Sequence, residues 1–427
     1  MNISLRDLDS FGGIAAEDEP VLDYFLSTPS VDRILTGDRL LVLGRKGSGK
    51  TALVTHFTES NAEEHGKPLS LKSYPWTAHS ELVDKGASET EAYVASWKLL
   101  IAIRMASHVV SRDTGKFYTD SLAALRKFLL DNFGSLDPDT RSIVQHGRMS
   151  VEALTIAPQL AGTALGSINL RRKDANRILG AELNALTTSI LNDVTKSIAE
   201  LGISRLFMHF DELDQGLDQL DEKRTYMLIG LILAAREISN DKSLRANISP
   251  VVYLRTDIWD QLAFSDKNKI SRQSTESLVW DADSLLQLVN IRIRNKLGDR
   301  ASWKVLSDDQ KMRGSQTKFN HIVTRTFLRP RDVIQFLNEA LSIARKRDDY
   351  PLVFVNEDIN AARVGYSDYL KDELDDEIKP HWPQWAESLA VFSKSETITF
   401  QRSDFLKFYP KIRALSDQSA SYPQAAK

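Results

Sequence analysis

The stretch LVLGRKGSGKT, Leu41–Thr51, decides the fold class of this chain. It begins within a short apolar run, RLLVLG from Arg39 to Gly44, which has the composition of a buried parallel strand. The segment after the loop, TALVTHFTES, places its apolar residues at helical spacing. The loop between them fits G-x-x-x-x-G-K-[ST] at every fixed position. A strand, such a loop and a helix in this order predict a phosphate-binding loop.

The residue types of the loop suit a bound polyphosphate. Its glycines let successive backbone N–H groups point into an anion-sized hollow, and the helix that follows adds the positive end of its dipole. Lys50 is expected to reach the β- and γ-phosphates of a nucleotide, and Thr51 to place its hydroxyl on Mg²⁺. The alternative is a chance match in a glycine-rich turn. The residues expected to contact the nucleotide here are Gly44, Arg45, Lys46, Gly47, Ser48, Gly49, Lys50, Thr51 and Ala52.

A second apolar run, SRLFMHFDELD from Ser204 to Asp214, ends in acids and is typical of a strand end. Asp211 can hold Mg²⁺ through water, and Glu212 can activate the attacking water as a general base. By itself such a run marks an ordinary strand terminus. When such a run follows a phosphate loop, it favours an enzyme that hydrolyses ATP, or a protein switched by ATP. It argues against a kinase that transfers the phosphoryl group to a small molecule.

A third run, SPVVYLRTD from Ser249 to Asp257, also stops at polar residues. We favour Thr256 over Arg255 as a group that hydrogen-bonds the γ-phosphate or the attacking water, and the alternative is a plain strand terminus. Repeated strand and helix units with polar residues at the strand ends predict a doubly wound parallel sheet with its site along the carboxyl edge.

The segment LRPRDVIQFLNEAL, Leu328–Leu341, predicts a helix that starts at Pro330. Two arginines, Arg329 and Arg331, flank this proline and are expected to contact the nucleotide. Because a helix N-terminus favours acids, Arg331 in the first turn indicates a bound anion such as a γ-phosphate. The alternative is an ion pair with Asp332 or another acid.

The domain pattern follows from these elements. Residues 1–283 are expected to form an α/β P-loop NTPase core, a doubly wound parallel sheet with a mostly helical insertion near 113–180. Residues 284–349 are expected to form an all-helical lid, and residues 350–427 a smaller helical or winged-helix module.

Composition limits the alternatives. The chain of 427 residues has no cysteine and eight scattered histidines, which excludes disulfides and thiol nucleophiles and makes a structural zinc site unexpected. It shows no apolar run of about 18 residues and no signal peptide, so we expect a cytoplasmic protein without a membrane span. A net charge of −3 gives no overall attraction to nucleic acid. The basic segment DKNKISRQ, with Lys267, Lys269 and Arg272, forms a solvated loop or contacts a neighbour's nucleotide. The clusters Arg292–Lys296 and Arg345–Arg347 form solvated helix faces or contact nucleic acid.

Taken in order, GRKGSGKT, HFDELD, YLRTD and RPRD resemble the AAA+ branch of P-loop ATPases. More narrowly, the chain is similar to the bacterial origin-recognition-complex-like ATPases over about residues 10–345, through its lead-in FGGIAAED…LDYF, the loop GRKGSGKTAL and the helix RPRDVIQFLN.

The resemblance implies ATP and Mg²⁺ as ligands, hydrolysis coupled to conformational change, and self-association through nucleotide at subunit interfaces. It also implies that Arg331 is the lid arginine called sensor 2, and it makes a role in defence against phage plausible. Two alternatives remain open: a nucleotide-gated scaffold that docks an effector protein with little turnover, and an initiator-like DNA-binding ATPase. The acidic stretch KDELDDE, Lys371–Glu377, stands where a DNA-binding winged helix is expected and argues against duplex binding.

Overall fold

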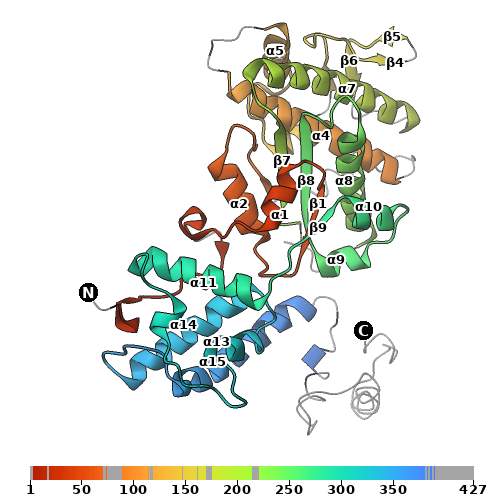
Figure 1. Ribbon diagram of the computed structural model, residues 1–427. Helices are drawn as coiled ribbons and strands as arrows, with labels where there is room; N and C mark the ends of the chain where they lie inside the picture. The colour runs from red at the N-terminus through yellow and green to blue at the C-terminus, as the bar shows by residue number, and fades with distance from the viewer. Residues whose placement is uncertain are drawn as a thin grey trace, which may run out of the picture. The chain divides into compact units, whose positions relative to one another are not determined.

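The computed structural model describes residues 3–16, 19–70, 74, 89–113, 115, 119–146, 148–160, 162–169, 176–213, 221–379, 382, 385, 386 and 389. Two compact units divide the chain, residues 1–362 and residues 363–427. The first unit contains an α/β core and a group of helices that follows it in the sequence (Figure 1).

A five-stranded parallel sheet forms the centre of the core, with strand order β2-β7-β8-β1-β9. Residue pairs such as Leu41↔Val252 and Phe210↔Val252 place β8 between β1 and β7. The strand that leads into the glycine-rich loop is therefore separated by one strand from the strand that ends in Asp211. The five strands are β1 (Leu41–Gly44), β2 (Leu69–Ser70), β7 (Leu206–Asp211), β8 (Ile248–Arg255) and β9 (Thr275–Ser277).

Helices cover both faces of the sheet, as expected for a doubly wound fold. Alternate strand residues such as Val42, Phe207 and Val251 pack with α1 (Pro29–Leu35) and α2 (Lys50–Ser60) on one face. Their neighbours, such as Met208 and Phe210, face the opposite side. That side is covered by α4 (Glu89–Ser111) and α8 (Glu222–Asn240), and α7 (Asn176–Leu201) packs against α4 (Figure 1).

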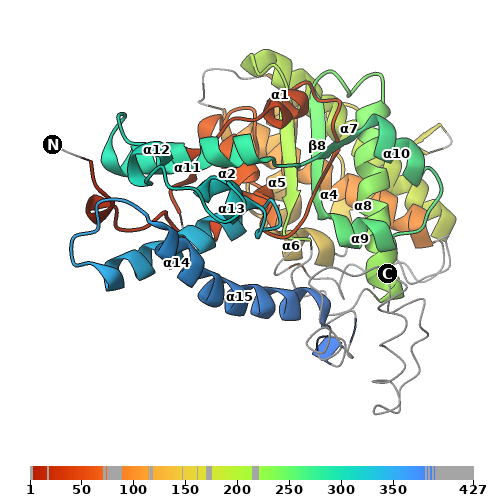
Figure 2. The same cartoon turned by 60° about the horizontal axis from the view of Figure 1, so that its bottom comes forward.

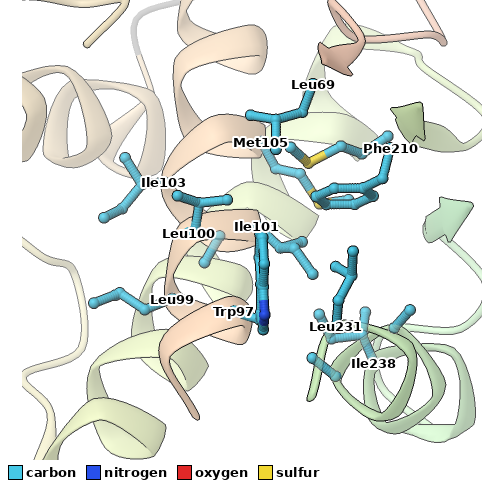
Figure 3. Close-up of a cluster of buried hydrophobic side chains, with 14 of the residues drawn as sticks. Leu69, Trp97, Leu99, Leu100, Ile101, Ile103, Met105, Phe210, Leu231 and Ile238 are labelled. Atoms are coloured by element: carbon cyan, nitrogen blue, oxygen red, sulfur yellow. The ribbon is translucent and has the colours of Figure 1, made fainter. Parts of the chain in front are cut away.

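The larger core lies between the sheet and α4. Trp97 is fully buried, and its indole N–H donates to the carbonyl of Met227 on α8 at 2.9 Å. Figure 3 shows Trp97, Met105 and Phe210 in this cluster together with Leu231 and Ile238 of α8. Burying this apolar side of α4 fixes the end of β7, and with it the position of Asp211.

The apolar helix α4 bears on the expectation that the chain has no membrane span. An 18-residue stretch within Thr90–Ser111 has a mean hydropathy of 1.2, and among the described residues this is the one helix long and apolar enough to cross a membrane. Of this stretch, 72% is buried inside the protein, as in a core helix.

Residues after β9 form a helical group that lies on the opposite side of the sheet from α4, α5 (Asp120–Phe133) and α7 (Figures 1 and 2). The Asp281 carboxylate caps its first helix by accepting from the N–H of Ser284 at 2.7 Å. The group comprises α11 (Ala282–Leu297), α12 (Trp303–Leu306), α13 (Lys318–Val323) and α14 (Pro330–Arg347), which we call the lid; α15 (Asn356–Ile378) follows.

The N-terminal segment, which has little regular structure, runs along the lid. The N–H of Phe11 donates to the side chain of Asn338 at 2.8 Å, and Arg345 donates to the carbonyl of Leu8 at 2.6 Å. The segment contains η1 (Leu5–Asp7) and η3 (Val21–Tyr24), and η3 contacts both α2 and α11. It therefore joins the core to the lid.

Two local predictions differ from the structure. The second half of the insertion near 113–180 is not helical: after α5 and α6 (Thr140–Gln145) it forms antiparallel ladders, because Gly162 (φ 81°) turns the chain and its small residues offer no apolar helical stripe. The basic segment Lys267–Arg272, expected as a solvated loop, lies in a short helix, α10 (Lys267–Gln273), which follows α9 (Thr256–Gln261). The ladders join β3 (Arg148–Ser150) to β6 (Ser167–Asn169) and β4 (Gln159–Leu160) to β5 (Thr163–Ala164). The segment ITFQRSDFLKFY of the expected C-terminal module lies outside the described residues.

Candidate functional site

The glycine-rich loop connects β1 to α2, as its sequence predicts. Gly47 (φ 76°) and Gly49 (φ 95°) adopt left-handed backbone conformations that favour glycine, and Gly49 is the N-cap of α2. A Cβ on Gly47 would lie 2.8 Å from the Cβ of Arg331, so a side chain there would also push the lid away. Backbone conformation and packing thus both require glycine at position 47.

Lys50 lies at the first turn of α2 and reaches back over the loop. Its ammonium group donates to the carbonyls of Gly44 at 3.1 Å and Arg45 at 3.2 Å. This contact holds a positive charge above the loop, where the loop and the helix end already favour an anion.

Asp211, the last residue of β7, meets the loop at the carboxyl edge of the sheet. Thr51 and Lys50 lie near enough to the Asp211 carboxylate for both to favour its charged form. Burial raises the pKa of Asp211 to about 6, although the Glu212 N–H, the Thr51 hydroxyl and Lys50 all act to lower it. The surrounding protein groups therefore do not fully offset the cost of burying this negative charge, and a bound cation would stabilise it.

Glu212 follows in a left-handed conformation (φ 56°), which is strained for a residue with a side chain. Its carboxylate accepts a hydrogen bond from the hydroxyl of Ser70, at the end of the neighbouring strand β2. Ser70 is a site residue that the sequence analysis missed, because nothing local marks a two-residue strand as the neighbour of β7.

The two lid arginines have different positions. Arg331 lines the cavity described below, and its Nε donates to the carbonyl of Ile14 at 3.3 Å. Arg329 is only 2% exposed and forms a bidentate ion pair with Asp332, at 2.6 and 3.1 Å. The pairing with Asp332 considered as the alternative for Arg331 is thus made by Arg329.

A cavity of about 360 Å³ lies between the loop, the end of β7, the lid and the N-terminal segment. It brings together the predicted Lys50, Thr51, Asp211, Glu212 and Arg331. The lining residues are Gly13, Ile14, Ala16, Val21, Tyr24, Lys46, Gly47, Gly49, Lys50, Thr51, Ala52, Asp211, Glu212, Arg292, Pro330, Arg331 and Ile334.

Five predicted site residues, Gly44, Arg45, Ser48, Thr256 and Arg329, are not among the described residues that line this cavity. The Arg45 guanidinium lies over the ring of Phe327, 5.0 Å from its centroid. Thr256 begins α9 directly after β8, so it lies at the carboxyl edge of the same sheet as Asp211. Its sensing role stays a prediction.

The N-terminal segment and Arg292 also line the cavity, although nothing in the sequence around them predicts that position. Arg292 is 9% exposed; its guanidinium lies over the Tyr24 ring at 4.1 Å and donates to the carbonyl of Phe11 at 2.7 Å. Burial lowers the pKa of Arg292. The interpretation of Arg292 as part of a solvated or nucleic-acid-binding face is therefore wrong.

A smaller hollow of about 100 Å³ adjoins the loop on the side of α2. Tyr24, Phe25 and Trp280 line it together with aliphatic side chains and the loop residues Ser48 and Gly49. Its mostly apolar and aromatic lining suits a flat ring system more than a charged group.

Residues of the other basic clusters form ion pairs and hydrogen bonds within the fold. Lys296 pairs with Asp9 at 2.7 Å, and Arg347 pairs with Asp358 at 2.8 Å. Lys267 donates to the carbonyl of Leu262 at 2.7 Å. These contacts leave fewer cations for a nucleic acid than the sequence suggests.

Comparison with known proteins gives two matches. A family model for a FunZ-associated C-terminal helical domain matches residues 283–375, which begin in α11 and end in α15. This region starts next to the predicted lid boundary at 284 and continues past the boundary predicted at 349. A transposon gamma-delta 80.3 kDa protein of Escherichia coli (strain K12) is 23% identical over 433 residues, which cover 96% of this chain and 56% of that protein. The chain thus spans little more than half the length of this relative. No solved structure matches the chain.

Proposed function

We propose that this protein is an ATPase of AAA+ type that binds ATP and Mg²⁺ in the cavity between the α/β core and the helical lid. The observation that carries the proposal is that one cavity beside the glycine-rich loop is lined by Lys50, Thr51 and the buried Asp211. A hydroxyl and a carboxylate next to a glycine-rich loop form the oxygen-donor set that Mg²⁺ prefers when it binds with phosphates.

Each lining residue would have a distinct task. The backbone N–H groups of the loop and the Lys50 ammonium would bind the phosphates, and Thr51 and Asp211 would hold Mg²⁺. Bound Mg²⁺ would neutralise charge on the β- and γ-phosphates during transfer. The hollow next to Tyr24, Phe25 and Trp280 offers a place for the nucleoside base.

Hydrolysis would depend on Glu212 and Arg331. Glu212 lines the cavity next to Asp211 and would accept a proton from the attacking water as general base. Arg331 would bind the γ-phosphate from the lid, so that charge on the third phosphate favours a closed lid. Thr256, at the same sheet edge, would hydrogen-bond the attacking water or the γ-phosphate.

The test is steady-state phosphate release by wild type, Lys50→Ala and Glu212→Gln, with the exposed lid lysine variant Lys346→Ala as the matched control. We expect Lys50→Ala to lose ATP binding. Glu212→Gln should still bind ATP but turn over at least about 100-fold more slowly, since a general base contributes about that much or more. If Glu212→Gln hydrolyses ATP as fast as wild type, Glu212 is not the base.

A second candidate function is a nucleotide-gated scaffold that docks an effector protein and hydrolyses ATP slowly. The hydrogen bond from Ser70 to Glu212 favours it, because it occupies an acceptor site of the carboxylate and holds that side chain against the neighbouring strand β2. Mass measurement with ATP, with ADP and without nucleotide separates the two: an ATP-dependent assembly without turnover supports the scaffold.

We further propose that the protein is cytoplasmic and acts as a homo-oligomer or together with a partner protein. The name of the transposon gamma-delta relative supports a mobile-element context, which we extend to defence against phage. An initiator-like DNA-binding role is the weaker alternative, because Lys296, Arg345 and Arg347 make contacts within the fold. Salt-sensitive binding of a DNA duplex would revive it.

A further inference from the structure

The outward-facing carbonyls of the glycine-rich loop are held by residues that lie outside the core. Arg329, at the start of α14, donates from Nη1 to the carbonyl of Lys46 at 3.2 Å. Trp280, in the connection between β9 and α11, donates from its indole N–H to the carbonyl of Ser48 at 2.9 Å. Between them, the N–H of Arg331 meets the carbonyl of Gly47 at 3.4 Å.

These contacts fix the direction of the loop's N–H groups. In a planar trans peptide, the carbonyl of one residue and the N–H of the next point in opposite directions. Holding the carbonyls of Lys46 and Ser48 on the lid side therefore turns the N–H groups of Gly47 and Gly49 the other way. Gly47 and Gly49 both line the large cavity, and both have left-handed φ values that few other residues would adopt.

The two donors are themselves positioned rigidly. The Arg329 guanidinium is buried and held by both oxygens of Asp332, which is also fully buried, so its third nitrogen, Nη1, has a fixed direction. Trp280 belongs to the short connection that leads into the lid, so its position depends on where the lid lies. A displaced lid would remove both hydrogen bonds from the loop at once.

We infer that Trp280 and Arg329 are positioning residues that pre-organise the phosphate loop from its carbonyl side and couple its affinity for phosphate to the position of the lid. This inference rests on the proposed function, since it concerns the same cavity. The coupling is reciprocal: if a placed lid improves phosphate binding, bound phosphate stabilises the placed lid to the same extent.

Trp280→Phe is the sharpest test, because it removes the indole N–H and keeps an aromatic ring. Losing one hydrogen bond to a neutral acceptor should weaken binding about threefold to tenfold. The loss should appear in the KM for ATP, with kcat nearly unchanged, because the loop binds the ground state and the transition state alike. Trp303→Phe is the matched control: Trp303 is a buried lid tryptophan that stacks on Phe354, and its variant should bind ATP like wild type.

Trp280 also lines the smaller hollow, so inorganic tripolyphosphate serves as a second probe that has no base or sugar. We expect Trp280→Phe to weaken the binding of tripolyphosphate and the binding of ATP by the same factor. A loss for ATP alone would overturn the inference and assign Trp280 to base recognition. Arg329→Lys keeps a positive charge beside Asp332 but loses the donor to Lys46, and it should weaken tripolyphosphate in the same way.

Fluorescence supplies a readout that a purely structural role would not change. The difference in emission between wild type and Trp280→Phe isolates one of the seven tryptophans, and it should change when Mg²⁺ and ATP are added. Wild type that binds no ATP would refute the proposed function. Wild type that binds ATP, with a Trp280→Phe variant of equal affinity for ATP and tripolyphosphate, would refute only the positioning role.

Discussion

Replacing Asp211 with Asn should stabilise the nucleotide-free protein while removing its ability to use Mg²⁺. Burial raises the pKa of Asp211 from its ordinary 3.8 to about 6, so the fold favours the protonated carboxyl over the carboxylate. Multiplying this difference by 1.36 kcal/mol for each pKa unit gives about 3 kcal/mol. Asparagine has a similar shape and no charge, so Asp211→Asn should raise the free energy of unfolding by up to about 3 kcal/mol at pH 8.

The sign of the pH dependence follows from the same shift. Because the folded pKa is raised, the stability contributed by protonated Asp211 is fully present below about pH 4 and is lost as the pH rises through about 6. The advantage of Asp211→Asn should therefore be largest at pH 8, fall to about half at pH 5, and vanish at lower pH. Urea unfolding without Mg²⁺ or nucleotide, at several pH values, measures this directly.

A matched control comes from Asp358, which is also buried but is paired with Arg347 at 2.8 Å. Asp358→Asn should lose about 1.5–3 kcal/mol, the value of a hydrogen bond to a charged group. Adding Mg²⁺ and ATP should then stabilise wild type and leave Asp211→Asn nearly unchanged. An Asp211→Asn variant that is less stable than wild type at pH 8 would refute the view that this carboxylate is held at a cost for a cation.

Three further predictions concern the same cavity. Gly134→Ala should cost the roughly 1–2 kcal/mol of an alanine in a left-handed conformation, and Gly47→Ala should cost more. Of these two positions, only at 47 would the added Cβ meet another side chain, and thermal unfolding of both variants compares the losses. Thr51→Val should weaken the Mg²⁺-dependent part of ATP binding about tenfold or more, whereas Thr51→Ser should retain it; titration calorimetry with and without Mg²⁺ decides, and equal losses would contradict the metal role. Arg331→Ala should weaken the binding of ATP about 10-fold to 100-fold and that of ADP little. The control Arg345→Ala, which removes a side chain that contacts Leu8, should change neither affinity. Equal losses for ATP and ADP would place Arg331 away from the γ-phosphate.

The sequence predicts the parts of the site that depend on local spacing. The loop from Gly44 to Thr51 and the acids after the run ending in Phe210 can be located because a strand, a loop and a helix each leave a pattern a few residues long. Parallel strands then bring their carboxyl ends to one edge, which is why Thr51 and Asp211 line the same cavity.

The remaining parts of the cavity come from contacts between distant segments. Tyr24, Trp280 and Arg292 line it or the adjoining hollow, yet each belongs to a stretch whose local pattern indicates only loop or helix surface. Ser70 belongs to a two-residue strand, too short for any periodicity. Pairwise packing between the lid, the N-terminal segment and the core decides these positions, and a single sequence without tertiary contacts does not reveal them.

The pairing of the lid arginines illustrates the same limit. The sequence places Arg329 and Arg331 on either side of Pro330 but does not say which one meets Asp332. Helix geometry places residues three apart on one face, and the buried Asp332 therefore pairs with Arg329, which turns Arg331 toward the cavity.

The most direct test of the central claim is a crystal structure of the full chain with Mg²⁺ and a non-hydrolysable ATP analogue. We expect the phosphates to be bound by the N–H groups of the loop and by Lys50, Mg²⁺ to be bound to the Thr51 hydroxyl with Asp211 in its shell, and Arg331 to contact the γ-phosphate. An analogue bound elsewhere, or no analogue bound at a concentration that saturates the protein in solution, would contradict the claim.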